Sequence, residues 1–134
     1  MTERLLHQYL MWSWLGLALP VFILLLFVSV PYGRHFRGGW GPGISPIAGW
    51  MIMELPAAFT FATCILAEGW PESWAVLVFL FMWQTHYLQR TFIYPALLRS
   101  KKRMSLLVVL MAVCFNVMNG YINGEKTPEY IYRR

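Results

Sequence analysis

Apolar residues fall into four long runs, and short segments between the runs hold most of the charged residues. The runs cover residues 9–30, 47–67, 74–98 and 104–122. A helix needs ~20 residues to cross the ~30 Å hydrocarbon core of a bilayer, and each run has about that length. The pattern predicts an all-α fold, a polytopic membrane helix bundle of four transmembrane helices, with residues 1–134 forming a single domain.

Composition supports a membrane location. Hydrophobic residues make up 58% of the chain and charged residues 13%, whereas soluble domains carry ~25% charged residues. The net charge of +5 comes from basic residues that flank the apolar runs, which favours an orientation signal over a nucleic-acid surface. We therefore expect membrane lipid around the protein and no nucleic-acid partner. The first run is longer than the ~7–15-residue apolar region of a signal peptide, so we expect it to be retained.

The basic residues also predict an orientation. Arg34 and Arg37 lie between the first two runs, and a basic segment at 99–103 lies between the last two. With four spans these two loops share one side, and the positive-inside rule places that side in the cytoplasm and the N-terminus outside. This corresponds to the inner membrane of a bacterium, or to the endoplasmic reticulum of a eukaryote.

A glutamate, Glu54, interrupts the second apolar run. A carboxylate at membrane depth costs at least ~2.5–3.5 kcal/mol, so it requires a partner or a water-filled cavity. With a helix rise of ~1.5 Å per residue, Glu54 lies ~12 Å from the cytoplasmic end of its helix and Tyr87 ~16 Å deep on the next one. The short connection makes these helices neighbours, which predicts that Glu54 and Tyr87 meet.

Two further sets of polar residues recur at helical spacing, which places each set on one helix face. The set in the third run includes Arg90. An arginine inside the membrane is too costly to face lipid, so the helix face that carries this set is expected to point into the bundle. Intramembrane asparagines also join helices structurally, at ~0.6–2 kcal/mol each, and for them that interpretation stays open. The sets are Tyr87, Arg90, Thr91 and Tyr94 in the third run and Asn116, Asn119 and Asn123 in the fourth.

Other chemistries are disfavoured. The chain has no aspartate, no cluster with metal-ligand spacing and no glycine-rich phosphate loop, and His86 points to a different face from Tyr87. We therefore expect no metal site and no haem. Cys64 and Cys114 lie in apolar runs and are expected to be buried free thiols.

Four motifs occur in the order and at the spacing found in the steroid 5α-reductases, and over about residues 32–121 the chain resembles the N-terminal half of that family. The compact loops favour a bacterial member. The motifs are Tyr32-Gly33-Arg34-His35, Glu54-Leu55-Pro56, residues 86–95 (HYLQRTFIYP) and Asn119-Gly120-Tyr121.

The resemblance implies a seven-helix membrane oxidoreductase of the 3-oxo-5α-steroid 4-dehydrogenase type. Such an enzyme reduces the Δ4 double bond of 3-oxo steroids with NADPH, by hydride transfer to C5 and formation of an enolate. It implies that Glu54 and Tyr87 are catalytic and bind the substrate 3-oxo oxygen. A phenol and a protonated carboxyl in a dry site can stabilise the enolate as oxyanion-hole donors do.

The resemblance also implies NADPH contacts on the cytoplasmic side. Family members have about twice this length, so we expect the chain to carry the substrate-polarising half, with a C-terminal half as its partner, and to be inactive alone. The substrate would be a steroid or a similar 3-oxo lipid. The residues implied for NADPH are Tyr32, Tyr94, Arg99, Lys101 and Asn119.

Two other functions remain open. The chain could be a small non-catalytic anchor or assembly subunit in which Glu54 and Arg90 form a structural ion pair. It could also be a transporter or channel segment with Glu54 lining a pathway. The first two runs do not echo the last two in the placement of polar residues, so an inverted repeat is disfavoured.

Overall fold

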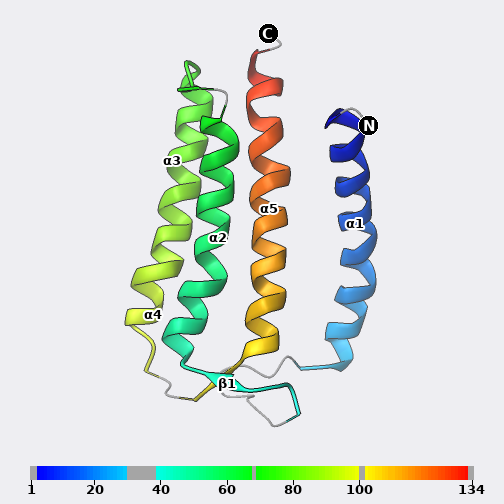
Figure 1. The fold of residues 1–134 in the computed structure, drawn as a ribbon, viewed down its shortest axis with the longest axis vertical. Coiled ribbons are helices and arrows are strands. Elements are labelled where there is room, and N and C mark those ends of the chain that lie inside the picture. Colours follow the sequence, from blue (N-terminus) through cyan, green and yellow to red (C-terminus); the bar gives the residue numbers. More distant parts are fainter. Residues whose placement is uncertain (1–2, 30–38, 68, 100–101, 133–134) are drawn as a thin grey trace. The chain divides into compact units, whose positions relative to one another are not determined.

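The computed structural model describes residues 3–29, 39–67, 69–99 and 102–132. The fold is all-α apart from two strands of two residues each, as the sequence predicts (Figure 1). In chain order the elements are α1 (Glu3–Phe27), β1 (Gly43–Ile44), α2 (Pro46–Leu66), α3 (Trp74–Leu88), the π-helical segment η2 (Gln89–Ile93), α4 (Tyr94–Ala96), β2 (Met104–Ser105) and α5 (Leu106–Tyr132).

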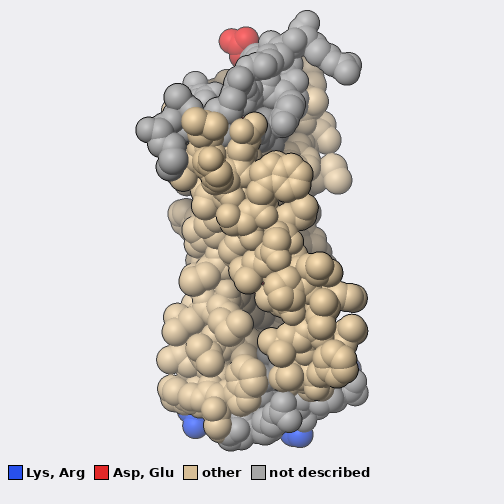
Figure 2. Space-filling view, turned by 90° about the vertical axis from the view of Figure 1, so that its right-hand side faces the viewer, with Lys and Arg blue, Asp and Glu red and all other residues tan. Residues whose placement is uncertain are grey.

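Among the described residues, three helical stretches are long and apolar enough to cross a membrane: Leu5–Phe27, Pro46–Leu66 and Leu106–Glu125. The third predicted span, 74–98, is helical from α3 to α4 but is not one unbroken α-helix, because η2 interrupts it. Among the residues coloured in Figure 2, nearly all of the visible surface belongs to residues other than Lys, Arg, Asp and Glu. These features fit a membrane bundle.

The interruption has a local cause. The N–H of Tyr94 bonds the carbonyl of Gln89, which is the i→i+5 bond of a π-helix. Pro95 follows directly and has no N–H to continue the α-helical pattern. Single π-turns of this kind are frequent at functional sites, and this one contains Arg90.

The chain divides into two compact units, Met1–Val30 and Pro31–Arg134. The first unit consists of α1, a 25-residue apolar helix with Pro20 in its interior. The expectation that this helix joins the others in one bundle stays a prediction.

In the second unit, α2 packs against both α5 and α3. One buried apolar cluster joins Met53 of α2 to Met104 of β2 and Val109 of α5. A second joins Phe61 and Ile65 of α2 to α3. The helix that carries Glu54 therefore lies between the two helices that carry the other polar candidates.

Two glycines allow α5 to approach α2 closely. A Cβ added at Gly120 would lie 3.0 Å from the Ala57 carbonyl oxygen and 3.1 Å from the Phe61 nitrogen. A Cβ added at Gly124 would lie 3.2 Å from the Phe61 carbonyl oxygen. Small residues four positions apart are typical of tightly packed transmembrane helices. Side chains of α5 beside these glycines are thereby brought within hydrogen-bonding reach of the neighbouring helices.

Polar side chains from both neighbours reach the backbone of α2. Trp83 Nε1 of α3 donates to the Ala57 carbonyl at 3.1 Å, and Gln84 Nε2 donates to the Ala58 carbonyl at 2.9 Å. Asn116 of α5 donates to the Met53 carbonyl. In a membrane such bonds satisfy groups that water cannot reach, and they fix α2 against α3 and α5.

The loops at one end of this unit are joined by the short strands. Gly43 pairs with Ser105 and Ile44 with Met104 in antiparallel register. The Ser105 hydroxyl also donates to the Trp40 carbonyl. The first loop and the loop before α5 therefore lie on the same side, as the count of spans predicts.

Both cysteines are free thiols. Cys64 is half-buried, whereas Cys114 is exposed, so the expected burial of Cys114 is wrong. The face of α5 that packs on α2 carries Gly120 and Gly124, and Cys114 lies on another face of that helix.

Replacing Gly120 with leucine is expected to lower the stability of the protein by about 1–3 kcal/mol or more, because the added side chain must displace the backbone of α2. The measurement is thermal unfolding in detergent. Val117→Leu adds a methylene to a residue of the same helix that is 39% exposed, and is the control. Equal unfolding temperatures for the two variants would contradict the close contact.

Candidate functional site

Glu54 forms an ion pair with Arg90. The glutamate is on α2 and is 6% exposed, and the arginine comes from η2. Arg90 Nη2 lies 2.7 Å and Arg90 Nε 3.1 Å from the same oxygen, Oε1 of Glu54. The π-turn thus supplies the cation that a carboxylate at this depth requires.

Two aromatic rings hold the guanidinium in place. Its central carbon lies 4.7 Å from the centre of the Trp50 ring and 5.5 Å from that of Tyr94. The two rings also contact each other edge-on, with centres 4.7 Å apart. Trp50 lies one helical turn before Glu54, and Tyr94 one turn after Arg90. Cation–π contacts of this kind stabilise a cation away from water.

Both hydrogen bonds from Arg90 end on Oε1 of Glu54. The guanidinium has only donors, so Glu54 is the acceptor in this pair. In the part of the chain that the structure describes, Arg90 bonds Oε1 and not the second carboxylate oxygen, Oε2. From burial alone, Glu54 is expected to be a protonated carboxyl group that donates a hydrogen bond. The structure shows in addition that the Arg90 guanidinium lies beside it.

Tyr87 begins a chain of hydrogen bonds that leads to α5. Asn119 Nδ2 lies 2.8 Å from the Tyr87 hydroxyl oxygen. Asn123 Nδ2 lies 3.0 Å from Asn119 Oδ1 and 2.8 Å from the Asn119 carbonyl oxygen. The Tyr87 ring also contacts Trp83, with ring centres 5.0 Å apart. The phenol is thus held on both its ring and its hydroxyl group.

Glu54 and Tyr87, which were predicted to meet, each bond a different residue. Glu54 bonds Arg90 and Tyr87 bonds Asn119, and Tyr87 and Arg90 are three residues apart on α3 and η2. The structure therefore gathers a carboxylate, a guanidinium and a phenol in one polar region between the helices.

The structure describes three of the five residues expected to contact NADPH. Tyr94 lies against Arg90 and Trp50, Asn119 bonds Tyr87, and Arg99 is exposed after α4. Tyr32 and Lys101 lie outside the described residues. In the part of the chain that the structure describes, no group of three His, Cys, Asp or Glu side chains could hold a metal ion.

The polar stripe of the third run is only partly inward-facing. Thr91 is fully buried and donates to the Tyr87 carbonyl at 2.7 Å, whereas the Arg90 side chain is 37% exposed. The π-turn explains this, because it rotates the residues after Gln89 relative to α3. Sequence reasoning did not assign Trp50 to the site, although its spacing of four from Glu54 is a usable signal.

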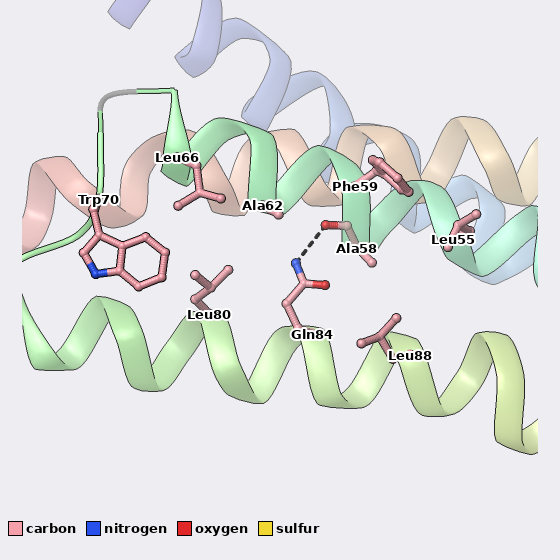
Figure 3. A pocket seen from close by; sticks show the side chains of 9 residues that line it. All are labelled: Leu55, Ala58, Phe59, Ala62, Leu66, Trp70, Leu80, Gln84 and Leu88. Carbon is pink, nitrogen blue, oxygen red and sulfur yellow. Dashed lines mark hydrogen bonds between the residues drawn. The ribbon is translucent and has the colours of Figure 1, made fainter.

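An apolar groove of about 380 Å³ runs between α2 and α3 (Figure 3). Gln84 reaches across it to the Ala58 carbonyl, and Trp70 lies at one end. Neither Glu54 nor Tyr87 lines it, so it is separate from the polar region. The other lining residues are Leu55, Phe59, Ala62, Leu66, Leu80 and Leu88.

No family model matches the chain. Curated proteins do. The chain is 34% identical over 137 residues to steroid 5-alpha-reductase of Gossypium hirsutum, which covers 96% of this chain and 52% of that protein. It is 32% identical over 134 residues to 3-oxo-5-alpha-steroid 4-dehydrogenase 1 of Bos taurus, which covers 97% of this chain and 52% of the relative. The chain thus spans about half the length of the curated relatives it matches.

Replacing Arg90 is expected to lower the stability of the protein more than replacing Glu54. Arg90→Met leaves the buried Glu54 carboxylate without its cation, and breaking a buried pair in this way costs about 3–5 kcal/mol. Because Arg90 is partly exposed, we expect the lower end of that range. Glu54→Gln removes the charge and should cost less.

The double variant Glu54→Gln/Arg90→Met is therefore expected to unfold at a higher temperature than Arg90→Met alone. Arg99→Met, at an exposed position, is the control and should change stability by less than about 0.5 kcal/mol. Strictly additive effects of the two substitutions would contradict a direct interaction.

Proposed function

This chain belongs to the steroid 5α-reductase family, and we propose that it carries the part of a membrane reductase that binds and polarises the 3-oxo group of a Δ4 steroid or a similar 3-oxo lipid. The observation that supports this most directly is the pair of oxygen atoms left available in the polar region. One is Glu54 Oε2, and the other is the Tyr87 hydroxyl, which accepts from Asn119 and keeps its own hydrogen.

In the proposed reaction the Tyr87 hydroxyl donates to the 3-oxo oxygen of the substrate. With substrate bound, Glu54 is proposed to take up a proton on Oε2 and to donate a hydrogen bond from it to the same oxygen, while Oε1 stays bonded to Arg90. As C5 is reduced, negative charge develops on the 3-oxo oxygen, and two fixed donors in a dry site stabilise it as an oxyanion hole does. A proton that comes from solvent water is then added at C4, which completes the reduction of the double bond.

NADPH, when bound, supplies the hydride. We assign its contacts to Tyr32, Tyr94, Arg99 and Lys101. The exposed guanidinium of Arg99 suits a phosphate group, with which arginine forms charge-assisted hydrogen bonds. Asn119 was also expected to contact NADPH. We instead give it the role of holding the Tyr87 hydroxyl, because the two side chains form a 2.8 Å hydrogen bond.

We further propose that the two loops joined by β1 and β2 face the cytoplasm, where NADPH is available. The relatives are about twice as long as this chain. The turnover of a whole relative would then also use residues of its other half, which completes the cofactor site.

A structural role for the ion pair is the second candidate, and the 2.7 Å contact itself favours it. In that case the chain is an anchor or assembly subunit, and the pair joins α2 to η2. The two functions differ in one respect. A structural pair affects assembly and stability alone, whereas a substrate site affects turnover in protein that remains folded.

Glu54→Gln and Tyr87→Phe are each expected to lower kcat for a 3-oxo-Δ4 steroid by about 10²–10³-fold, which is the typical cost of losing one oxyanion donor. The measurement is NADPH-dependent turnover in membranes containing the protein as its gene encodes it. Gln84→Leu removes another hydrogen bond between α2 and α3 without touching either residue, and should retain turnover. Full activity in both site variants would reject the assigned roles.

Arg99→Ala is expected to raise KM for NADPH by about tenfold, because a hydrogen bond between a charged side chain and phosphate is worth about 1.5–3 kcal/mol. The KM for the steroid should not change. Arg103→Ala, at an exposed position in the same loop, is the control. An unchanged KM for NADPH in Arg99→Ala would remove that residue from the cofactor site.

A further inference from the structure

We infer that Asn123 is a positioning residue that fixes the direction in which the Tyr87 hydroxyl donates its hydrogen. Its amide orients Asn119, and Asn119 in turn makes the phenol oxygen an acceptor from the protein. The hydrogen of Tyr87 is then directed to a ligand. This inference rests on the proposed function, in which Tyr87 donates to the 3-oxo oxygen.

The orientation of the Asn123 amide is set by the backbone. The side-chain atom that lies 2.8 Å from the Asn119 carbonyl oxygen must be the nitrogen, because a carbonyl oxygen only accepts hydrogen bonds. The reverse orientation would place two oxygen atoms in contact. The backbone of α5 therefore decides which end of this side chain is the donor.

The Asn119 amide follows from that of Asn123. The NH2 group of Asn123 lies 3.0 Å from Asn119 Oδ1 as well. If Asn119 were reversed, its own NH2 group would face the NH2 group of Asn123, and two donors would oppose each other. Asn119 therefore presents Oδ1 to Asn123 and Nδ2 to Tyr87.

The direction of the last bond decides the role of Tyr87. Asn119 Nδ2 donates to the phenol oxygen at 2.8 Å, so the hydroxyl hydrogen must point elsewhere. Hydrogen bonds in a chain also polarise one another, so a phenol that accepts becomes a better donor. Asn123 thus acts on the ligand through Asn119 and Tyr87, without touching it.

The sequence of α5 builds this chain from two Asn-Gly pairs, Asn119-Gly120 and Asn123-Gly124. The glycines lie against the backbone of α2, and the asparagine before each lies about 100° away around the helix. Asn116 is on the same helix but donates to the Met53 carbonyl of α2. It is therefore an asparagine with a purely structural bond, which provides a matched control.

The test is the C3 carbonyl stretching frequency of a 3-oxo-Δ4 steroid labelled with ¹³C at C3 and bound without NADPH. The protein is used as its gene encodes it, in membranes. A donated hydrogen bond lowers this frequency, so Tyr87→Phe marks the value without that donor. Asn123→Leu has no amide, which frees Asn119 to reverse and Tyr87 to donate to the protein.

We expect Asn123→Leu to shift the carbonyl frequency towards that of Tyr87→Phe. Its kcat should fall by at least about tenfold, within the hundredfold cost of a lost oxyanion donor, while KM for the steroid changes less. Asn116→Leu should lower the unfolding temperature and leave the frequency unchanged. Asn123→Ala provides the same readout in a second side chain if the leucine variant does not fold.

A wild-type frequency in Asn123→Leu or Asn123→Ala, with a shifted frequency in Tyr87→Phe, would overturn this inference and leave the proposed function standing. A wild-type frequency in Tyr87→Phe would show that Tyr87 does not donate to the 3-oxo group. In that case the proposed role of Tyr87 fails, and the inference about Asn123 fails with it.

Discussion

The placement of a carboxylate inside an apolar helix is the constraint on which the rest of the second unit depends. Glu54 is almost fully buried on α2, and an unpaired charge there would cost several kcal/mol. The Arg90 guanidinium offsets this cost with two hydrogen bonds to one oxygen, and the rings of Trp50 and Tyr94 stabilise the guanidinium in turn. The π-turn in η2 places Arg90 where it can do so. The helical segment from α3 to α4 departs from a regular α-helix at η2, and the arginine of that turn pairs with the carboxylate.

The glycines of α5 bring a hydrogen-bond partner to the Tyr87 phenol, as η2 brings one to Glu54. Without side chains at Gly120 and Gly124, the backbones of α5 and α2 come into direct contact. That contact brings Asn119 within 2.8 Å of the hydroxyl of Tyr87 on α3. Both halves of the polar region therefore depend on how three helices pack, and Glu54 and Tyr87 are each held by a partner from a different element. Such support is what keeps donors at fixed positions when charge develops on a ligand.

Much of this could be predicted from the sequence, because the apolar runs and helical spacing are local properties. The spans of α2 and α5, the neighbouring positions of α2 and α3, and the shared side of the two loops all follow from them. The pairing of Glu54 with Arg90 was predicted only for the alternative in which the chain is an anchor or assembly subunit, because depth matching favoured Tyr87 as the partner of Glu54. The orientation of Asn119 towards Tyr87 also depends on the close packing at Gly120, which is a three-dimensional property. The family resemblance predicts roles for Glu54 and Tyr87, but it does not predict which residues hold them in place.

The most direct test of the central claim is an experimental structure of the protein, as its gene encodes it, with a 3-oxo-Δ4 steroid bound. The account predicts that the 3-oxo oxygen lies within hydrogen-bonding distance, about 2.6–3.2 Å, of both the Tyr87 hydroxyl and a carboxyl oxygen of Glu54. A steroid bound instead in the apolar groove beside Gln84 and Trp70, with its 3-oxo oxygen away from both residues, would contradict it.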